Sequence, residues 1–208
     1  MKSFLLVLAV VLAVSASGFA QAATESAASA PNFDDKYLKH YMEETSQQFL
    51  ASIDGLTEEQ WKFKASPESW SIAEAAEHIA LTEAFFNGMI SGMLKTPGEA
   101  GMKEKVQGKE EMVLKNIAVV TQKAQAPEPV KPAGKYASKA ELVEAFESMR
   151  AANLKMLAEH SGELREHFSD GPVGPLDAYQ WLMFTAAHSR RHTTQIENVK
   201  AASGYPKT

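Results

Sequence analysis

Two histidines four residues apart are the first feature of this sequence that could carry chemistry. His188 and His192 lie in a stretch whose apolar residues recur at helical spacing. Residues at i and i+4 share one face of a helix, so two imidazoles placed in this way could bind the same metal ion. The chain contains no cysteine, so any metal site must be built from histidine, aspartate or glutamate. The pair predicts two ligands, and a third must come from another helix.

His78 is the best candidate for that third ligand. It lies in the middle of another apolar-rich helical stretch, between Ala76 and Ala80, and such a position tends to face the interior of a bundle. Three neutral imidazoles with one open position are an arrangement of catalytic zinc sites, where the ion lowers the pKa of a water. The competing interpretation is that each histidine is a hydrogen-bonded core residue, because H-x-x-x-H often arises by chance.

Two polar residues lie one turn from these histidines. Glu74 precedes His78 by four residues and could accept the ring N–H that a bound metal does not use, which would orient the imidazole. The alternative is that Glu74 only closes a capping box with Ser71 at the start of the helix. Gln195 follows His192 by three residues, shares its face, and could hydrogen-bond a water or a substrate.

Other residues that could do chemistry are expected to have ordinary structural roles. Arg190 and Arg191 should point elsewhere on their helix and form ion pairs or the edge of a dimer. His160 and His167 flank the helix break at Gly162 among several glutamates, which is typical of a surface. The three tryptophans are expected in the hydrophobic core: Trp61, Trp70 and Trp181.

Four stretches of helical periodicity must position these residues. Capping boxes open the second at Ser71 and the third at Ser138, and Pro175 or Leu176 is suited to the first turn of the fourth. No stretch alternates as a strand would. The sequence therefore predicts an all-α four-helix bundle without strands. The expected helices span approximately residues 34–53, 71–95, 138–161 and 175–202.

A long excursion, residues 96–137, separates the second and third expected helices. Within it, Lys109 to Lys123 predict a modest extra helix, and Pro127, Pro129 and Pro132 predict an extended connection. A connection of this length is unusual in a compact bundle. It is either a functional lid or a family-specific insertion, and the sequence leaves both open.

The beginning of the chain resembles a targeting segment. An apolar run of eleven residues, Phe4 to Val14, follows a positive start and precedes Ala20-Gln21-Ala22. This pattern predicts a secretory signal peptide of residues 1–22. The alternative, an uncleaved membrane anchor, would need about 20 apolar residues. We therefore expect an exported protein, periplasmic or secreted.

The remainder predicts one domain. Residues 23–31 are small and polar and should form a flexible lead-in, and residues 32–208 have the length of a single helical domain. The formal net charge is −5, which argues against a nucleic-acid partner because such a partner requires a basic face. No later apolar run approaches membrane length, so no membrane contact is expected after signal cleavage.

Two segments resemble signatures of the DinB-like (damage-inducible) superfamily of metal-binding helical bundles. Pro67–Ile79 contains W-S-x-x-E-x-x-x-H, which that family carries at its second helix, and Ala187–Ile196 contains the H-x-x-x-H-x-x-Q-I of its last helix. The ending Gly204-Tyr205-Pro206 is also similar. The two motifs are modest alone but specific as a pair in this order, and the likeness covers nearly the whole chain after residue 22.

The resemblance implies an up-down-down-up four-helix bundle of the DinB/YfiT-like type, with residues 96–137 as a long insertion between helices 2 and 3. It also implies a homodimer in many members. Carried over residue by residue, the family's ligands fall on His78, His188 and His192. These would hold one divalent ion, with zinc or nickel the first expectations.

The sequence is compatible with three functions. The first is a metal-dependent hydrolase acting on an unknown small molecule; thiol transfer, which family members perform with small cytoplasmic thiols, fits an exported chain less well. No carboxylate pair, Ser-His-Asp order or H-E-x-x-H is visible to supply a general base. The second is non-catalytic binding of a metal or small ligand. The third is a structural role in dimerisation or stress tolerance, with the histidines as relics.

Overall fold

The computed structural model describes residues 31–99, 101–118, 125–171 and 173–207. The expected signal peptide, residues 1–22, and nearly all of the expected lead-in lie outside these ranges. Asn32–Thr208 form one compact unit. Among the described residues no helix is long and apolar enough to cross a membrane.

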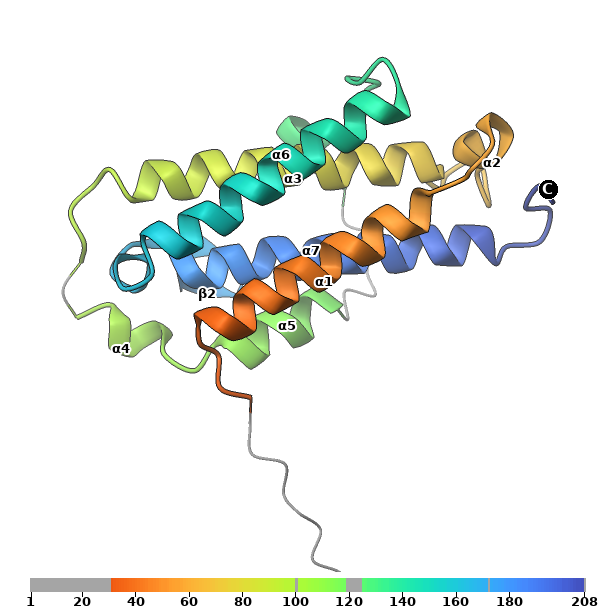
Figure 1. Ribbon diagram of the computed structural model, residues 1–208. Helices are drawn as coiled ribbons and strands as arrows, with labels where there is room; N and C mark the ends of the chain where they lie inside the picture. Colours follow the sequence, from red (N-terminus) through yellow and green to blue (C-terminus); the bar gives the residue numbers. More distant parts are fainter. Residues whose placement is uncertain (1–30, 100, 119–124, 172, 208) are drawn as a thin grey trace, which may run out of the picture. The chain divides into compact units, whose positions relative to one another are not determined.

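Four long helices form the body of this unit (Figure 1), as the periodicity predicts. The helix α3 packs against both α6 and α7, and α1 packs against the same two helices. The all-α prediction is therefore confirmed for the described residues, apart from one small hairpin. The long helices are α1 (Asp35–Ile53), α3 (Ile72–Met93), α6 (Lys139–Glu159) and α7 (Ala178–Lys200).

Polar side chains set the starts of these helices. Ser71 and Glu74 form the predicted capping box at α3: the Ser71 hydroxyl accepts the Glu74 N–H, and the Glu74 carboxylate accepts the Ser71 N–H. Ser138 caps α6 as predicted, but the Glu141 carboxylate accepts the N–H of Ala137 instead of closing the box. Each cap satisfies amide groups that the helix itself leaves without partners.

The prediction that the chain lacks strands is wrong at one place. Strands β1 (Phe168–Gly171) and β2 (Gly174–Asp177) form an antiparallel hairpin in which Phe168 pairs with Asp177. Four-residue strands that contain glycine and proline show almost no alternation, so periodicity could not reveal them. Because Pro175 and Leu176 belong to β2, α7 starts later than predicted, at Ala178, with Asp177 as its cap.

The hairpin also explains a second wrong prediction. His167, expected at the surface, is buried, and its carbonyl oxygen accepts the Ala178 N–H that opens α7. His160 stays at the surface, where its ring bonds to Glu163. Burial of His167 follows from the turn of the chain into β1, which no local pattern indicated.

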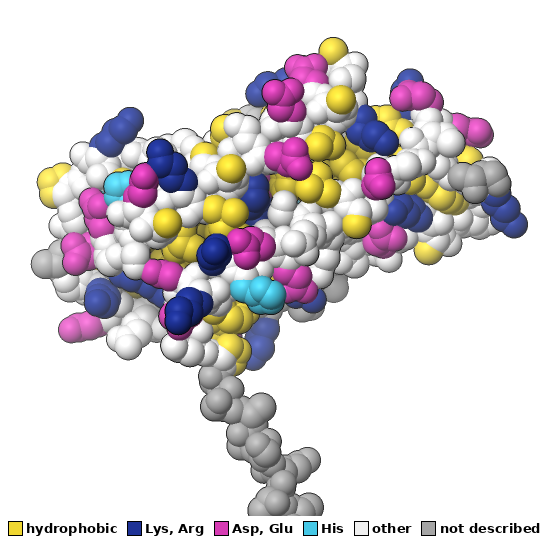
Figure 2. Space-filling view, in the orientation of Figure 1, with side chains coloured by type: hydrophobic (Ala, Val, Ile, Leu, Met, Phe, Trp, Pro, Cys, Tyr) yellow, Lys and Arg dark blue, Asp and Glu magenta, His cyan; other side chains and the backbone are white. Residues whose placement is uncertain are grey.

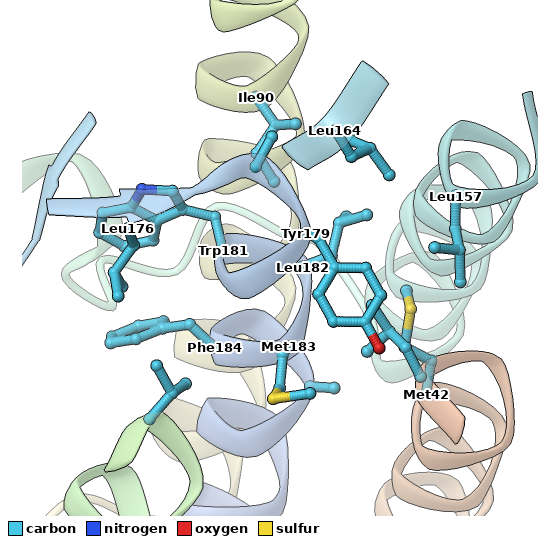
Figure 3. Close-up of a cluster of buried hydrophobic side chains, with 14 of the residues drawn as sticks. Met42, Ile90, Leu157, Leu164, Leu176, Tyr179, Trp181, Leu182, Met183 and Phe184 are labelled. Atoms are coloured by element: carbon cyan, nitrogen blue, oxygen red, sulfur yellow. The ribbon is translucent and has the colours of Figure 1, made fainter. Parts of the chain in front are cut away.

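Two clusters of buried apolar side chains fill the bundle. One surrounds the first half of α7 (Figure 3), and Trp181 belongs to it. The other contains Trp61 and an edge-to-face pair of Phe49 and Phe146, whose ring centroids are 4.6 Å apart. Burying each such side chain stabilises the fold by about 1.5–3 kcal/mol. Trp70 is only partly buried, so it departs from the core position predicted for it.

The excursion lies against the bundle. It contains α4 (Lys103–Val106), α5 (Glu110–Ala118) and one turn of 3-10 helix, η1 (Glu128–Val130). The helix α5 packs on α7 and η1 packs on α3, and Figure 1 shows α5 beside α7. The extra helix predicted from Lys109 to Lys123 is thus present as α5, and its predicted end lies outside the described residues. The remaining short elements are α2 (Glu58–Lys62) and η2 (Glu163–Arg165).

The exposed surface mixes both signs of charge. On the face shown in Figure 2, basic and acidic side chains are interspersed, with apolar side chains visible between them. Phe85 is the large hydrophobic side chain most clearly exposed among the described residues, at 45%.

Candidate metal centre

The three histidines singled out by spacing come together. His78 projects from α3, and His188 and His192 project from α7; one ligand atom of each lies within 4.8 Å of the others. The Nε2 atoms of His78 and His188 are 3.2 Å apart. Since α3 and α7 pack along their lengths, residues 110 positions apart in the sequence meet at one point. The group could hold a metal ion.

Aromatic rings wall this centre. The Trp70 ring lies 4.8 Å from the His78 ring and 5.9 Å from the His192 ring, centroid to centroid. The Phe184 ring stacks on the His188 ring at 6.1 Å, with an interplanar angle of 14°. His78 and His192 are buried, and His188 is partly exposed. Trp70 and Phe184 therefore pack against the three imidazole rings.

Two of the rings have hydrogen-bond partners that determine which ring nitrogen carries the proton. The Nδ1 atom of His78 lies 2.6 Å from the carbonyl oxygen of Val130. A carbonyl oxygen only accepts, so Nδ1 must donate, which leaves the Nε2 lone pair of the neutral ring free. The Nδ1 atom of His192 lies 2.8 Å from Oε1 of Gln195, and the same assignment follows. Both Nε2 atoms are therefore available as ligand atoms.

The centre also contains buried atoms without partners. Nε2 of His192 and Nδ1 of His188 make no hydrogen bond to any described residue. A buried polar atom without a partner costs free energy. A cation among the Nε2 atoms would give the His192 nitrogen the partner that it lacks, so the residues present fit a metal ion.

Burial keeps the three imidazoles neutral. Desolvation lowers the pKa of His78, lowers that of His188 well below its usual value, and lowers the pKa of His192 to about 3. The neighbouring histidines, whose protonated forms would repel, lower the pKa of His188 and His192 further. A metal ligand must be unprotonated, and at neutral pH these rings already are.

Arg191 is predicted to form an ion pair or the edge of a dimer, and the dimer edge stays a prediction. The positive charge of its partly buried side chain lowers the pKa of all three histidines, so it acts on the centre rather than away from it. Within the described parts of the chain it forms no ion pair or hydrogen bond. Arg190 is exposed, and its charge acts on Tyr37 and Tyr41 of α1. Arg191 therefore contributes positive charge near the centre.

The two predicted neighbours of the histidines differ in outcome. Gln195 contacts the His192 ring itself, rather than a free position beside it. Glu74 accepts the Ser71 N–H and pairs with Lys64, so the structure has the capping-box alternative. The partner of His78 is the Val130 carbonyl, and a backbone oxygen leaves no signal in the sequence. The contact of Trp70 with the histidines was also not predicted. Its one signal in the sequence is that Trp70 directly precedes Ser71, the cap of the helix that carries His78.

Comparison with known proteins adds a family relationship. The family model described as the DinB superfamily matches residues 41–196, a range that includes all three histidines. The chain is similar to "Uncharacterized protein YuaE" of Bacillus subtilis (strain 168), at 27% identity over 149 residues, which are 71% of this chain and 88% of that protein. No solved structure matches the chain.

Proposed function

The chain belongs to the DinB superfamily, and we propose that it binds one divalent metal ion through Nε2 of His78, His188 and His192. The observation that carries this proposal is the convergence of three neutral imidazoles within 4.8 Å, one with a buried Nε2 that has no other partner. Zinc and nickel are the proposed ions, because imidazole nitrogens suit them while calcium and magnesium prefer oxygen ligands.

The proposed reaction class is metal-dependent hydrolysis of a small molecule. A divalent ion, when bound, supplies Lewis acidity at the centre. The chain's own residues contribute the rest: Trp70 and Phe184 limit access of water, and the charge of Arg191 favours an anionic group on the ligand. An anion would also offset the charge of an ion held by three neutral imidazoles.

A specific observation favours a second candidate, a protein that binds a metal or small ligand without turnover. The two carboxylates nearest to His78 in the sequence are committed to other bonds: Glu74 to Ser71 and Lys64, and Glu77 to backbone amides. A hydrolase needs a base within reach of the attacking water. Turnover measurements on ester, amide and phosphate substrates, with His78→Ala as the control, separate the two candidates.

Export and self-association belong to the same proposal. The leader-like sequence of residues 1–22 supports a periplasmic or secreted protein, and a mature N-terminus after Ala22, read by mass spectrometry, would test it.

Phe85, exposed on α3, lies next to Phe86 and could contribute to a homodimer interface. Light scattering on the wild-type chain and on Phe85→Ser tests that second point.

Metal content of the untagged chain tests the central proposal. After incubation with zinc and desalting, we expect about one ion per chain, because three preformed ligands bind without a folding cost. His78→Ala should lose the ion. His160→Ala, which alters a surface histidine, is the matched control and should keep it. Less than about a tenth of an ion per wild-type chain would be inconsistent with a site of useful affinity.

A further inference from the structure

A segment of the excursion is fastened to α3 at two consecutive residues, Glu77 and His78. We call this segment, residues 128–136, the strap. It begins with η1, which packs on α3, and ends at Tyr136, which packs partly buried against the core. Both fastenings involve backbone groups of the strap, so neither depends on the side chains that the strap carries.

The first fastening is a carboxylate held by three successive amides. Oε1 of Glu77 accepts the N–H groups of Ala133 and Lys135 at 3.1 and 2.8 Å, and Oε2 accepts that of Gly134 at 3.0 Å. Gly134 has φ +73°, a conformation that glycine adopts without strain. Its turn aims the three N–H groups inward, as in the backbone concavities that bind anions.

The second fastening is the hydrogen bond that orients His78. The Val130 carbonyl oxygen lies 2.6 Å from His78 Nδ1, and the Val130 residue is buried. The strap therefore supplies the group that decides which nitrogen of His78 carries the proton. A neutral histidine without such a partner prefers its proton on Nε2, the atom that faces His188.

We propose that Glu77 is a positioning residue that latches the strap onto α3, so that Val130 holds His78 in the Nδ1–H form with Nε2 free. The claim about metal affinity rests on the proposed function, in which His78 is a ligand. The claim about the His78 proton does not, since it concerns the metal-free chain.

The burial of Glu77 explains why the latch is strong. Its side chain is 6% exposed, and no lysine or arginine within the described residues forms an ion pair with it. A buried carboxylate needs compensating hydrogen bonds, and the strap amides provide them. Without the carboxylate, those amides have no partner on α3, and the strap loses the contact that keeps Val130 in place.

The matched variants are Glu77→Ala, Glu77→Gln and the control Glu128→Ala. Glu77→Gln keeps the shape of the side chain but directs an NH2 group at an amide that itself donates. Glu128 belongs to the strap but is exposed, and its side chain pairs with Lys131. Its loss therefore removes a charge of the same sign without touching the latch. The two Glu77 variants guard against one of them failing to fold.

The deciding readout is the proton position on His78, measured by long-range 1H–15N NMR on the metal-free chain. Wild type and Glu128→Ala should show a protonated Nδ1 and an unprotonated Nε2 at His78. Glu77→Ala should move the proton to Nε2, and Glu77→Gln should give a mixture. Amide exchange should accelerate at Ala133, Gly134 and Lys135 in both Glu77 variants. A merely structural role would not select one nitrogen of one ring.

Zinc titration provides the second readout. Loss of an orienting partner costs about 10–100-fold in metal affinity, and we expect about tenfold for Glu77→Ala. An unchanged His78 proton in both Glu77 variants would overturn the inference, as would an unchanged zinc Kd in a variant whose proton has moved. If the wild-type chain binds no zinc, the proposed function fails, and the proton position alone still decides whether Glu77 is the latch.

Discussion

Two buried polar clusters join α3 to α7, and they differ in how completely they are satisfied. In the first, Arg150 of α6 pairs with Glu83 of α3, and Ser189 of α7 donates to the same carboxylate. Asn153 donates to the other Glu83 oxygen at 2.9 Å. The second cluster is the histidine centre, which carries no charge pair. The two lie close in sequence, since Ser189 directly follows His188.

The two clusters differ in which of their buried polar atoms lack a hydrogen-bond partner. Arg150 also donates to the carbonyl oxygen of Met42 in α1, so the first cluster connects all four long helices. Within this cluster, Nε of Arg150 is the one buried atom that has no partner among the described residues. The histidine centre leaves Nε2 of His192 and Nδ1 of His188 without partners. A satisfied buried network specifies how helices pack, whereas the free Nε2 lone pairs of His78 and His192 offer a place for a cation. The first cluster holds the register in which the second can form.

Breaking the charged cluster should give the largest effect. Glu83→Ala leaves Arg150 buried without its counter-charge, and breaking a buried pair in this way costs about 3–5 kcal/mol of stability. Urea unfolding of the metal-free chain measures the loss. Glu43→Ala, which removes one half of an exposed pair with Lys39, is the control and should cost less than about 1 kcal/mol. Equal losses in the two variants would contradict the stabilising role assigned to the charged cluster.

Zinc should stabilise the chain through the second cluster. At a concentration of about 100 times its Kd, zinc should raise the free energy of unfolding by about 2.7 kcal/mol through mass action on the folded state. His78→Ala should lose this response, and His160→Ala should keep it. Thermal unfolding with and without zinc provides the measurement, and an equal rise in all three proteins would assign the response to some other site.

The pH dependence should come from the histidine centre as well. The folded-state pKa of His192 is lowered to about 3, below the value of about 6.5 in an unfolded chain. The unfolded state therefore takes up more protons below that value, so this histidine's contribution is complete above pH 6.5 and is lost as the pH falls toward the folded pKa.

Between pH 6.5 and 5, His192 should cost the metal-free chain about 1–2 kcal/mol of stability. His192→Gln should reduce that slope, because its side chain does not titrate. Unfolding curves across this range compare the two proteins, with His160→Gln as the control. A slope unaffected by the His192 change would mean that burial does not hold this ring neutral.

The smallest expected effect concerns Arg191. Its charge opposes a cation at the centre, so Arg191→Gln should tighten zinc binding by a factor of about 2–5, the range of a weak, partly screened charge interaction. Arg190→Gln, which removes the neighbouring exposed charge, should change the Kd less. Competition with a chelator at low salt gives both values. Weaker zinc binding in Arg191→Gln would show that the guanidinium supports the centre instead.

Much of this arrangement follows from local sequence patterns. Apolar periodicity predicted the four long helices, and side-chain caps at Ser71 and Ser138 marked two of their starts. The i, i+4 spacing placed His188 and His192 on one face, and the apolar surroundings of His78 indicated an inward position. These are properties of single helices, so the sequence carries them directly.

The features that the sequence did not predict depend on contacts between distant segments. The partner of His78 is a carbonyl oxygen 52 residues away, and every residue has such an oxygen. The hairpin at Phe168–Asp177 is too short to show alternation, so the burial of His167 could not be foreseen. The effect of Arg191 on His78 depends on the packing of α3 on α7, because the helix of Arg191 itself carries only His188 and His192.

X-ray absorption at the zinc edge of the loaded, untagged chain identifies the atoms bound to the ion. We expect three imidazole nitrogens at about 2.0–2.1 Å from the ion in wild type, and the loss of this signature in His78→Ala. A first shell made of oxygen atoms in the wild-type chain, or an imidazole shell unchanged in His78→Ala, would contradict a centre formed by His78, His188 and His192.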